Sequence, residues 1–279
     1  MVSAIGEMTD FLPFDAAARR RARDRAAGLI SGREQLLRHI DEELAARRAL
    51  LGPAPEGPEL RIGLLLPPPE GSIGLDPSPV LAKRHGGLSG DEAQRHFDDG
   101  RFARVTALMT LHGVNDLPGA LRLIRRALMS QGRFQAAFPA GFSAASVRDA
   151  FVAADGGETD AAIPRVGPTV DPAEAAGLLQ RAGFADPVAE VVDLTLRYRT
   201  LADFALDARA HGDSGWLAAR RRGLTTPRRW ARAEDAFAAG RQQDGRVPVT
   251  VQILYVSGKA ESPADLFRRK FGAHWAAGR

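Results

Sequence analysis

The feature that most constrains the fold is a short, proline-rich connection between two apolar segments in residues 60–80. The first segment, Arg61 to Leu66, has the composition of a buried strand, and the second, Ile73 to Asp76, is a short strand ending on an acid. Two such strands begin and end a β-strand–helix–β-strand unit of a doubly wound sheet. A glycine-rich turn and a helix are expected between them, but only Pro67 to Gly71 stand there.

The connection of five residues is too short for an ordinary crossover between parallel strands. Parallel strands need a crossover of about a dozen residues or more. Returning along a strand like 61–66 means covering about 20 Å at about 3.3 Å per residue, whereas five extended residues reach at most about 18 Å. The prolines also offer no backbone N–H, which a loop that cradles a phosphate or carboxylate requires. Two arrangements stay open: the strands pair antiparallel as a hairpin, or one of them lies outside the sheet.

Composition indicates a globular chain in a reducing compartment. The 279 residues suffice for one large domain or one and a half, with 44% hydrophobic and 26% charged residues. No apolar run is long enough for a membrane span, and the N-terminus lacks the pattern of a secretory signal. The absence of cysteine predicts a cytoplasmic protein. The histidines show no i, i+4 pair with an intervening Glu, so no metal site is predicted.

Positive charge comes almost entirely from arginine. The net charge is +4, and only three of the 38 basic residues are lysine. The abundance of arginine and alanine indicates a GC-rich bacterial genome. Nucleic-acid binding requires basic residues on one face with interleaved aromatics, but the clusters 19–25 and 220–222 are poor in aromatics. These clusters predict solvated helix faces or acidic protein partners, not nucleic acid.

The N-terminal part is expected to be helical. Residues 14–28 predict a basic helix, and Ser31 with Glu34 forms a capping-box pattern that starts a second helix running to about Leu51. Residues 52–58, rich in proline and glycine, predict a linker.

The remainder alternates strands and helices, with Asn115-Asp116 and Asp171 as helix caps. Further strands are expected at 86–90, 104–111, 133–138, 188–198 and 247–257, and helices at 79–85, 117–128, 172–182, 200–211, 214–222 and 226–240. The expected organisation is basic helices and a linker over 1–58, an α/β domain over 59–260 with a helical insertion at about 200–240, and a tail over 261–279.

Several stretches together carry a resemblance to a known family. They are FDAAARRRARDRAA (14–27), IGLDPSP (73–79), LHGVNDLPGALRLIRRAL (111–128), LLQRAGF (178–184), LTLRY (194–198), ARAHGDSGWLAARRR (208–222) and DGRVPVTVQILYVSG (244–258). The chain resembles the class I S-adenosylmethionine-dependent methyltransferases of the respiratory complex I assembly factor type. It resembles more distantly the malonyl-acyl-carrier-protein methyltransferase of biotin synthesis. The resemblance implies a Rossmann-like α/β sheet with helices on both faces, a truncated first unit, a helical N-terminal extension and a helical insertion before the last strand.

The resemblance also implies roles for a few residues. Asp76 matches the acid that accepts hydrogen bonds from the cofactor ribose hydroxyls, and Asp91 matches the acid near the adenine amino group. His112, Asn115 and Asp116 lie where substrate approaches the methyl group, with His112 as the candidate catalytic residue. Each residue also has a structural interpretation: a turn for Asp76, helix caps for Asp91 and Asn115-Asp116, and a structural imidazole for His112.

Departures from the family pattern lead to two hypotheses. The glycine motif and its helix have no counterpart, and Ala103, Gly113 and Gly215 replace an expected Asp, aromatic and Asn. The favoured hypothesis is a methyltransferase-like protein that has lost S-adenosylmethionine binding and acts as a binding or assembly factor, with a respiratory complex subunit as its protein partner. The alternative is an active methyltransferase or an arginine hydroxylase of the assembly-factor type.

The tail carries one further pattern. Residues 264–275 place Phe267, Phe271 and Trp275 four residues apart beside basic residues. This spacing is typical of a short amphipathic helix that contacts a membrane surface or a partner groove. A helix docked on its own domain, or a frayed terminus, is the alternative. If the tail helix contacts a membrane, the protein is predicted to be cytoplasmic and peripherally bound to the inner membrane.

Overall fold

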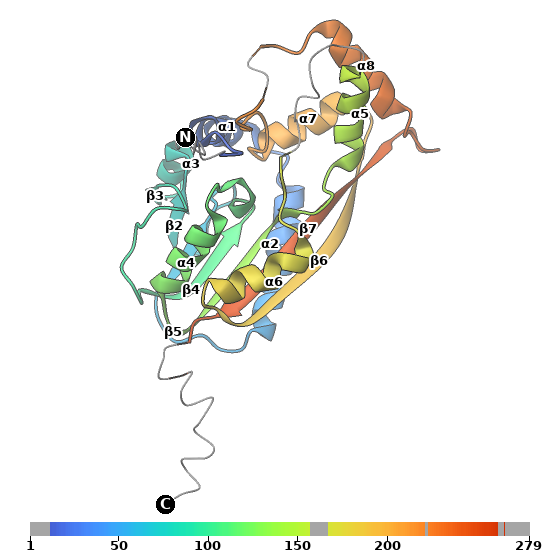
Figure 1. The fold of residues 1–279 in the computed structure, drawn as a ribbon. Helices are drawn as coiled ribbons and strands as arrows, with labels where there is room; N and C mark the ends of the chain where they lie inside the picture. Colours follow the sequence, from blue (N-terminus) through green and yellow to red (C-terminus); the bar gives the residue numbers. More distant parts are fainter. Residues whose placement is uncertain (1–11, 157–166, 221–222, 262–264, 266–279) are drawn as a thin grey trace, which may run out of the picture.

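A seven-stranded sheet forms the centre of the protein (Figure 1). The computed structural model describes residues 12–156, 167–220, 223–261 and 265. The strand order is β3-β2-β1-β4-β5-β7-β6. The first five strands in this order, β3-β2-β1-β4-β5, are parallel to their neighbours, and β7 is antiparallel to both β5 and β6. The strands are β1 Glu59–Ile62, β2 Ile73–Asp76, β3 Leu88–Ser89, β4 Phe102–Leu108, β5 Leu128–Ala140, β6 Ala185–Tyr198 and β7 Val247–Lys259.

Helices cover both faces of this sheet, which confirms the predicted α/β architecture (Figure 1). On one face, α4 (Leu117–Ala127) and α6 (Pro172–Arg181) pack on a core that includes Leu121, Phe134 and Leu179. On the other face, α2 (Gln35–Leu50) contributes Leu37, Ile40 and Leu44 to a second core. Apolar residues on both sides of the strands are what a mainly parallel sheet requires.

The remaining helices gather toward one end of the sheet (Figure 1). There α1 (Ala16–Leu29) lies beside α3 (Pro79–Arg84) and α7 (Leu201–Ala210). A third core joins α5 (Ala145–Asp155) to α8 (Pro227–Ala238). The helices α7 and α8 form the predicted insertion before the last strand, whereas α5 was not predicted.

The first unit differs from both predicted arrangements. β1 and β2 pair in parallel, with Leu60 opposite Ile73, so neither a hairpin nor a strand outside the sheet is correct. The reason is that β1 ends at Ile62, so the connection covers residues 63–72 instead of 67–71. A four-residue strand spans about 13 Å, and a connection of about ten residues reaches well beyond that. The leucines at 64–66 are buried in the second core but belong to the connection, not to a strand.

Aspartate caps start helices where the sequence predicted them. The Asp116 side chain accepts a hydrogen bond from Gly119 N at 2.8 Å at the start of α4. Asp171 accepts one from Ala173 N at 2.9 Å at the start of α6. Both bonds satisfy a backbone donor that a helix start leaves unpaired.

Two other predictions at helix starts are wrong. α2 begins at Gln35 with Glu34 as N-cap and no side-chain cap bond, so Ser31 does not cap it. Residues 214–220 form no helix; instead Leu217 makes an isolated bridge with Phe14. The Phe14 and Trp216 rings meet edge to face at 4.9 Å, so this segment is held by the N-terminal residues.

Within the described residues, no helix combines the length and apolarity needed to cross a bilayer. The tail pattern predicted over 264–275 lies outside the described residues apart from Asp265.

Candidate functional site

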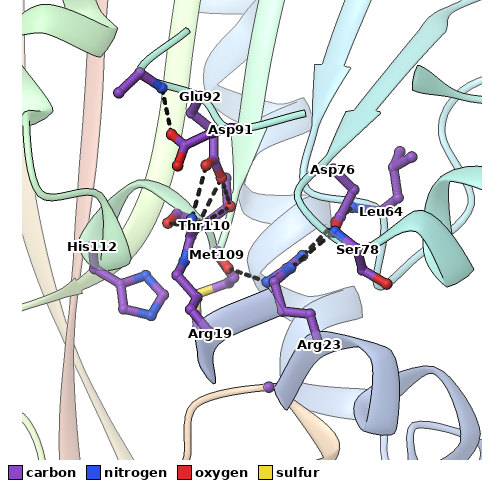
Figure 2. Close-up of polar contacts among 12 residues, drawn as sticks. Arg19, Arg23, Leu64, Asp76, Ser78, Asp91, Glu92, Met109, Thr110 and His112 are labelled. Atoms are coloured by element: carbon purple, nitrogen blue, oxygen red, sulfur yellow. Dashed lines mark hydrogen bonds and ion pairs between the residues drawn. The ribbon is translucent and has the colours of Figure 1, made fainter. Parts of the chain in front are cut away.

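Asp76, the last residue of β2, is fully buried, and both of its carboxylate oxygens are engaged (Figure 2). Arg23 donates from Nε to Oδ1 at 3.0 Å and from Nη2 to Oδ2 at 2.6 Å. The backbone N–H of Ser78 donates to Oδ1 at 2.8 Å, and that of Leu64 to Oδ2 at 2.7 Å. A carboxylate offers about four acceptor positions, so Asp76 has none left for another donor.

Arg23 reaches Asp76 because α1 packs a buried face over the ends of the strands. Alanines at 18, 22 and 26 are buried on this helix and allow close approach. Arg19 and Arg23 lie four residues apart, so both project from nearly the same side. Burial disfavours the charged form of Arg23, but the charge of Asp76 and its hydrogen bonds outweigh this, and the pKa of Arg23 is raised.

Arg19 makes a second buried pair, with Glu92 (Figure 2). Its Nη1 and Nη2 donate to the two carboxylate oxygens at 2.8 and 2.7 Å, and Nη2 also donates to Thr110 O at 2.7 Å. The Thr110 hydroxyl donates to the same carboxylate. Burial alone would raise the pKa of Glu92, but the Arg19 charge and these hydrogen bonds lower it to about 2.

The pairs Arg23–Asp76 and Arg19–Glu92, here called the two arginine clamps, therefore fix α1 over the ends of β2 and β4. The prediction of solvated faces or acidic protein partners is wrong for these two arginines, because their acidic partners belong to the chain itself. By contrast, Arg20, Arg21 and Arg25 on the same helix are exposed.

Of two adjacent acids, the buried one is Glu92 and not the predicted Asp91. Asp91 is only partly buried, and its Oδ1 accepts a hydrogen bond from Ala93 N at 2.8 Å. This local bond is that of a cap or turn. Nothing in the sequence distinguishes the two acids, because each could face either way in an irregular segment.

His112 faces a carboxylate that the sequence did not reveal. Its Nε2 lies 2.8 Å from Oδ1 of Asp213, which follows α7, and its ring lies 5.8 Å from that of Trp216. Burial raises the pKa of Asp213, but His112 reverses this, and the pKa is lowered overall. The His112 Nδ1 atom is buried and has no hydrogen-bond partner within the described residues. An imidazole held by a carboxylate is an arrangement suited to proton transfer.

Asn115 and Asp116 both serve the structure here. Asn115 accepts a hydrogen bond from Phe14 N at 3.0 Å and donates to Phe14 O at 2.9 Å, which fastens the start of the N-terminal segment. Asp116 caps α4. Their predicted contact with substrate stays a prediction. In the part of the chain that the structure describes, no group of three metal-ligating side chains could hold a metal ion.

No protein-family model matches the chain, but several known proteins are similar to it in sequence. A malonyl-[acyl-carrier protein] O-methyltransferase of Laribacter hongkongensis is 29% identical over 290 residues, covering 94% of this chain and 95% of the relative. A protein of the same name from Halorhodospira halophila is 33% identical over 160 residues, covering 57% of this chain and 52% of the relative. The mitochondrial arginine-hydroxylase NDUFAF5 of Danio rerio is 28% identical over 168 residues, covering 60% and 52%. The chain thus spans about half the length of the last two.

Solved structures agree on the fold. The YcgJ protein of Bacillus subtilis has a TM-score of 0.51 at 15% identity, covering 80% of this chain and 99% of that one. A candidate methyltransferase from Bacillus halodurans has a TM-score of 0.52 at 11% identity, covering 79% and 100%. The chain is therefore similar in sequence to malonyl-[acyl-carrier protein] O-methyltransferases and the arginine-hydroxylase NDUFAF5, and similar in fold to class I S-adenosylmethionine-dependent methyltransferases. The predicted family and Rossmann-like methyltransferase fold are both confirmed.

In this methyltransferase-like fold, the residues after β1 and at the end of β2 do not fit S-adenosylmethionine as they are arranged. The acceptors of Asp76 that would take ribose hydroxyls are all in use. A Cβ at Gly63 would lie 2.2 Å from Leu108 O, so the turn after β1 packs directly against the chain's own backbone at this residue. The prolines at 67–69 supply no N–H donors. A groove of about 700 Å³ does exist, but it lies between α2, β6 and α7 and is not lined by Asp76.

Proposed function

We propose that this chain is a non-catalytic member of the methyltransferase family that acts by binding a protein partner as an assembly factor. The observation that supports this most is the state of Asp76, whose four acceptor positions are filled by Arg23, Leu64 and Ser78. The residue that would hold the cofactor ribose instead holds α1 in place.

Energetics favour the clamp over the cofactor. A ribose diol at Asp76 must displace Arg23, and breaking a buried ion pair costs about 3–5 kcal/mol. An affinity of about 100 µM corresponds to only about −5.5 kcal/mol. An otherwise ordinary cofactor site would therefore bind about a hundredfold to several thousandfold more weakly.

Titration calorimetry with S-adenosylmethionine and S-adenosylhomocysteine tests the first half of the proposal. We expect no binding tighter than about 1 mM (about −4.1 kcal/mol) by the full chain. Binding tighter than about 100 µM that disappears in Asp76→Ala would overturn the proposal and restore the enzyme hypothesis.

The same titration on Arg23→Met separates a lost site from a closed one. If Arg23→Met also gives no binding heat, the result supports a lost site, because the Leu64 N–H still points to Asp76 and the turn at Gly63 still abuts β4. Cofactor binding that appears only in Arg23→Met would contradict the proposal, since the site would then be intact beneath a removable side chain.

The partner-binding surface that we propose is the exposed side of α1, formed by Arg20, Arg21 and Arg25. The clamps fix the backbone of this helix, so three arginines project toward solvent from a fixed support, and a basic surface of this kind is complementary to an acidic one. The resemblance to respiratory complex I assembly factors makes an acidic segment of a respiratory complex subunit the proposed partner. Peripheral membrane contact through residues 264–275 stays a separate prediction.

Replacing these three arginines by glutamate is expected to reduce partner capture at least tenfold in affinity purification with quantitative mass spectrometry. The free energy of unfolding should change little, because exposed substitutions typically change it by about 0.5 kcal/mol or less each. Reversing the scattered exposed residues Arg181, Arg228 and Arg246 makes the same change in charge and should leave capture intact. Equal losses in both variants would show that net charge, and not the α1 surface, governs capture. Deleting residues 14–27 is a poorer test, because it also removes both clamps.

One observation favours the alternative of an active methyltransferase or arginine hydroxylase. The His112–Asp213 pair is the arrangement of a general base, and it lies next to Arg19 through Gly113, whose added Cβ would meet Arg19 Nε at 2.5 Å. That alternative requires the cofactor to bind, so the titration above decides between the two.

A further inference from the structure

A row of polar side chains crosses the face of the sheet that α2 covers. Arg61 on β1 pairs in register with Thr106 on β4, which pairs with Gln135 on β5. Register partners point to the same face, and the neighbouring apolar residues belong to the opposite core under α4 and α6. A mainly parallel sheet normally presents apolar residues on both faces, so this row is not explained by the needs of the core.

The row is buried and incompletely bonded. Arg61 is 3% exposed and Gln135 is 4% exposed. Arg61 Nη2 donates to Asp41 Oδ1 of α2 at 2.7 Å, but Arg61 Nε and Gln135 Oε1 have no hydrogen-bond partner among the described residues. Burying an unpaired donor and an unpaired acceptor is costly, which points to a missing partner.

A cavity of about 110 Å³ adjoins both of these side chains. It is bounded by α2 through Asp41 and Arg48 and by the β1–β2 connection through Pro69 and Ser72. The connection makes no helix, so it does not fill the space above β1 and β4 as a crossover helix would. The shortened connection and the cavity are therefore parts of one structural feature, here called the β1–β4 crevice.

The crevice region carries an excess of positive charge. Glu59 is shared by Arg48 and by Arg104 Nε, the latter at 3.2 Å, and Asp41 is taken by Arg61. Arg133, in register with Arg104, makes its hydrogen bonds to backbone oxygens of Leu51 and Gln131 instead of to a carboxylate. Burial and repulsion from Arg48 lower the pKa of Arg104; the hydrogen bond and charge of Glu59 oppose this only in part, and Arg133 adds a smaller repulsion. An added anion would relieve this repulsion.

We propose that the β1–β4 crevice binds a small oxyanion that carries a hydroxyl group. Oxygen atoms of a phosphate or carboxylate group would accept hydrogen bonds from the Arg61 guanidinium, as these groups do wherever arginine recognises them. The hydroxyl would donate to Gln135, whose oxygen lacks a donor. The size of the cavity restricts the ligand to a group of a few non-hydrogen atoms. This site is separate from Asp76 and does not depend on the proposed function.

Calorimetric titration of the full chain with inorganic phosphate and, separately, with glycolate tests the proposal at constant ionic strength. We expect at least one of them to bind with a Kd below 1 mM, and the tighter of the two identifies the group. Gln135→Met keeps the side-chain volume but removes the acceptor, and it should weaken binding at least tenfold. The double variant Asp41→Asn/Arg61→Gln removes one charge of each sign and should do the same.

Two controls make the result specific. Gln180→Met, an exposed change on α6, and Asp207→Asn/Arg33→Gln, an ion pair elsewhere, should bind as the unaltered protein does. The proposal fails if neither anion binds, in which case water alone occupies the crevice. It also fails if an anion binds equally well to Gln135→Met and to the double variant, because the ligand then lies elsewhere.

Discussion

Replacing Arg23 by methionine is expected to lower the free energy of unfolding by about 3–5 kcal/mol, because it leaves the carboxylate of Asp76 charged and without its cation in a fully buried position. Methionine keeps much of the side-chain volume, so loss of packing contributes little. Urea unfolding followed by circular dichroism measures the change.

A double-mutant cycle identifies the cause of that loss. Arg23→Met combined with Asp76→Leu should be more stable than either single variant, since exchanging a buried pair for apolar residues is often neutral while breaking it is not. Arg33→Met breaks an ion pair with Asp207 that is partly exposed, and it should cost about 1 kcal/mol or less. A cost below about 1 kcal/mol for Arg23→Met would show that Asp76 is not dependent on the clamp.

The clamp and the shortened connection act on the same residue. The backbone N–H of Leu64, early in the connection, donates to Asp76 beside Arg23. A longer glycine loop would direct such donors toward a ligand, whereas this one directs its donor inward. The short connection and the buried acid are therefore linked, because hydrogen bonds to Asp76 tie the connection, β2 and α1 together.

Much of the fold could be predicted from local patterns. β2, α3, α4 and α6 were found because their boundaries carry turn residues or aspartate caps. The end of β1 could not be predicted, because a buried strand and a buried connection can have the same apolar sequence pattern. α5 was missed because Ala144, its N-cap, has a left-handed backbone and no capping side chain.

The site was less predictable than the fold, because its partners meet only in three dimensions. The position of Asp76 followed from the end of a strand, but Arg23 lies 53 residues away and Asp213 lies 101 residues from His112. One available signal was overlooked: alanines at 18, 22 and 26 mark a packed face of α1. Arginines next to such a face are expected to be buried and therefore paired.

The second clamp predicts a dependence of stability on pH that belongs to Glu92. Its pKa falls from an ordinary value of 4.5 to about 2 in the folded protein. A depressed pKa contributes stability that is fully present above pH 4.5 and is lost as pH falls toward 2. At about 1.4 kcal/mol for each pKa unit, the contribution is about 3 kcal/mol. The difference in unfolding free energy between the unaltered protein and Glu92→Gln should therefore shrink by about that amount between pH 5 and pH 2.

Glu190→Gln provides the matched comparison, because Glu190 also has a lowered pKa and an arginine partner, Arg47, but is exposed. Solvent screening limits exposed pairs to about 1 kcal/mol or less, so its stability difference should vary little with pH. Urea unfolding at several pH values gives both curves. If the Glu92→Gln curve ran parallel to that of the unaltered protein, Glu92 would titrate normally in the fold. Arg19 would then not hold it as a buried ion, and of the two arginine clamps only Arg23–Asp76 would fasten α1.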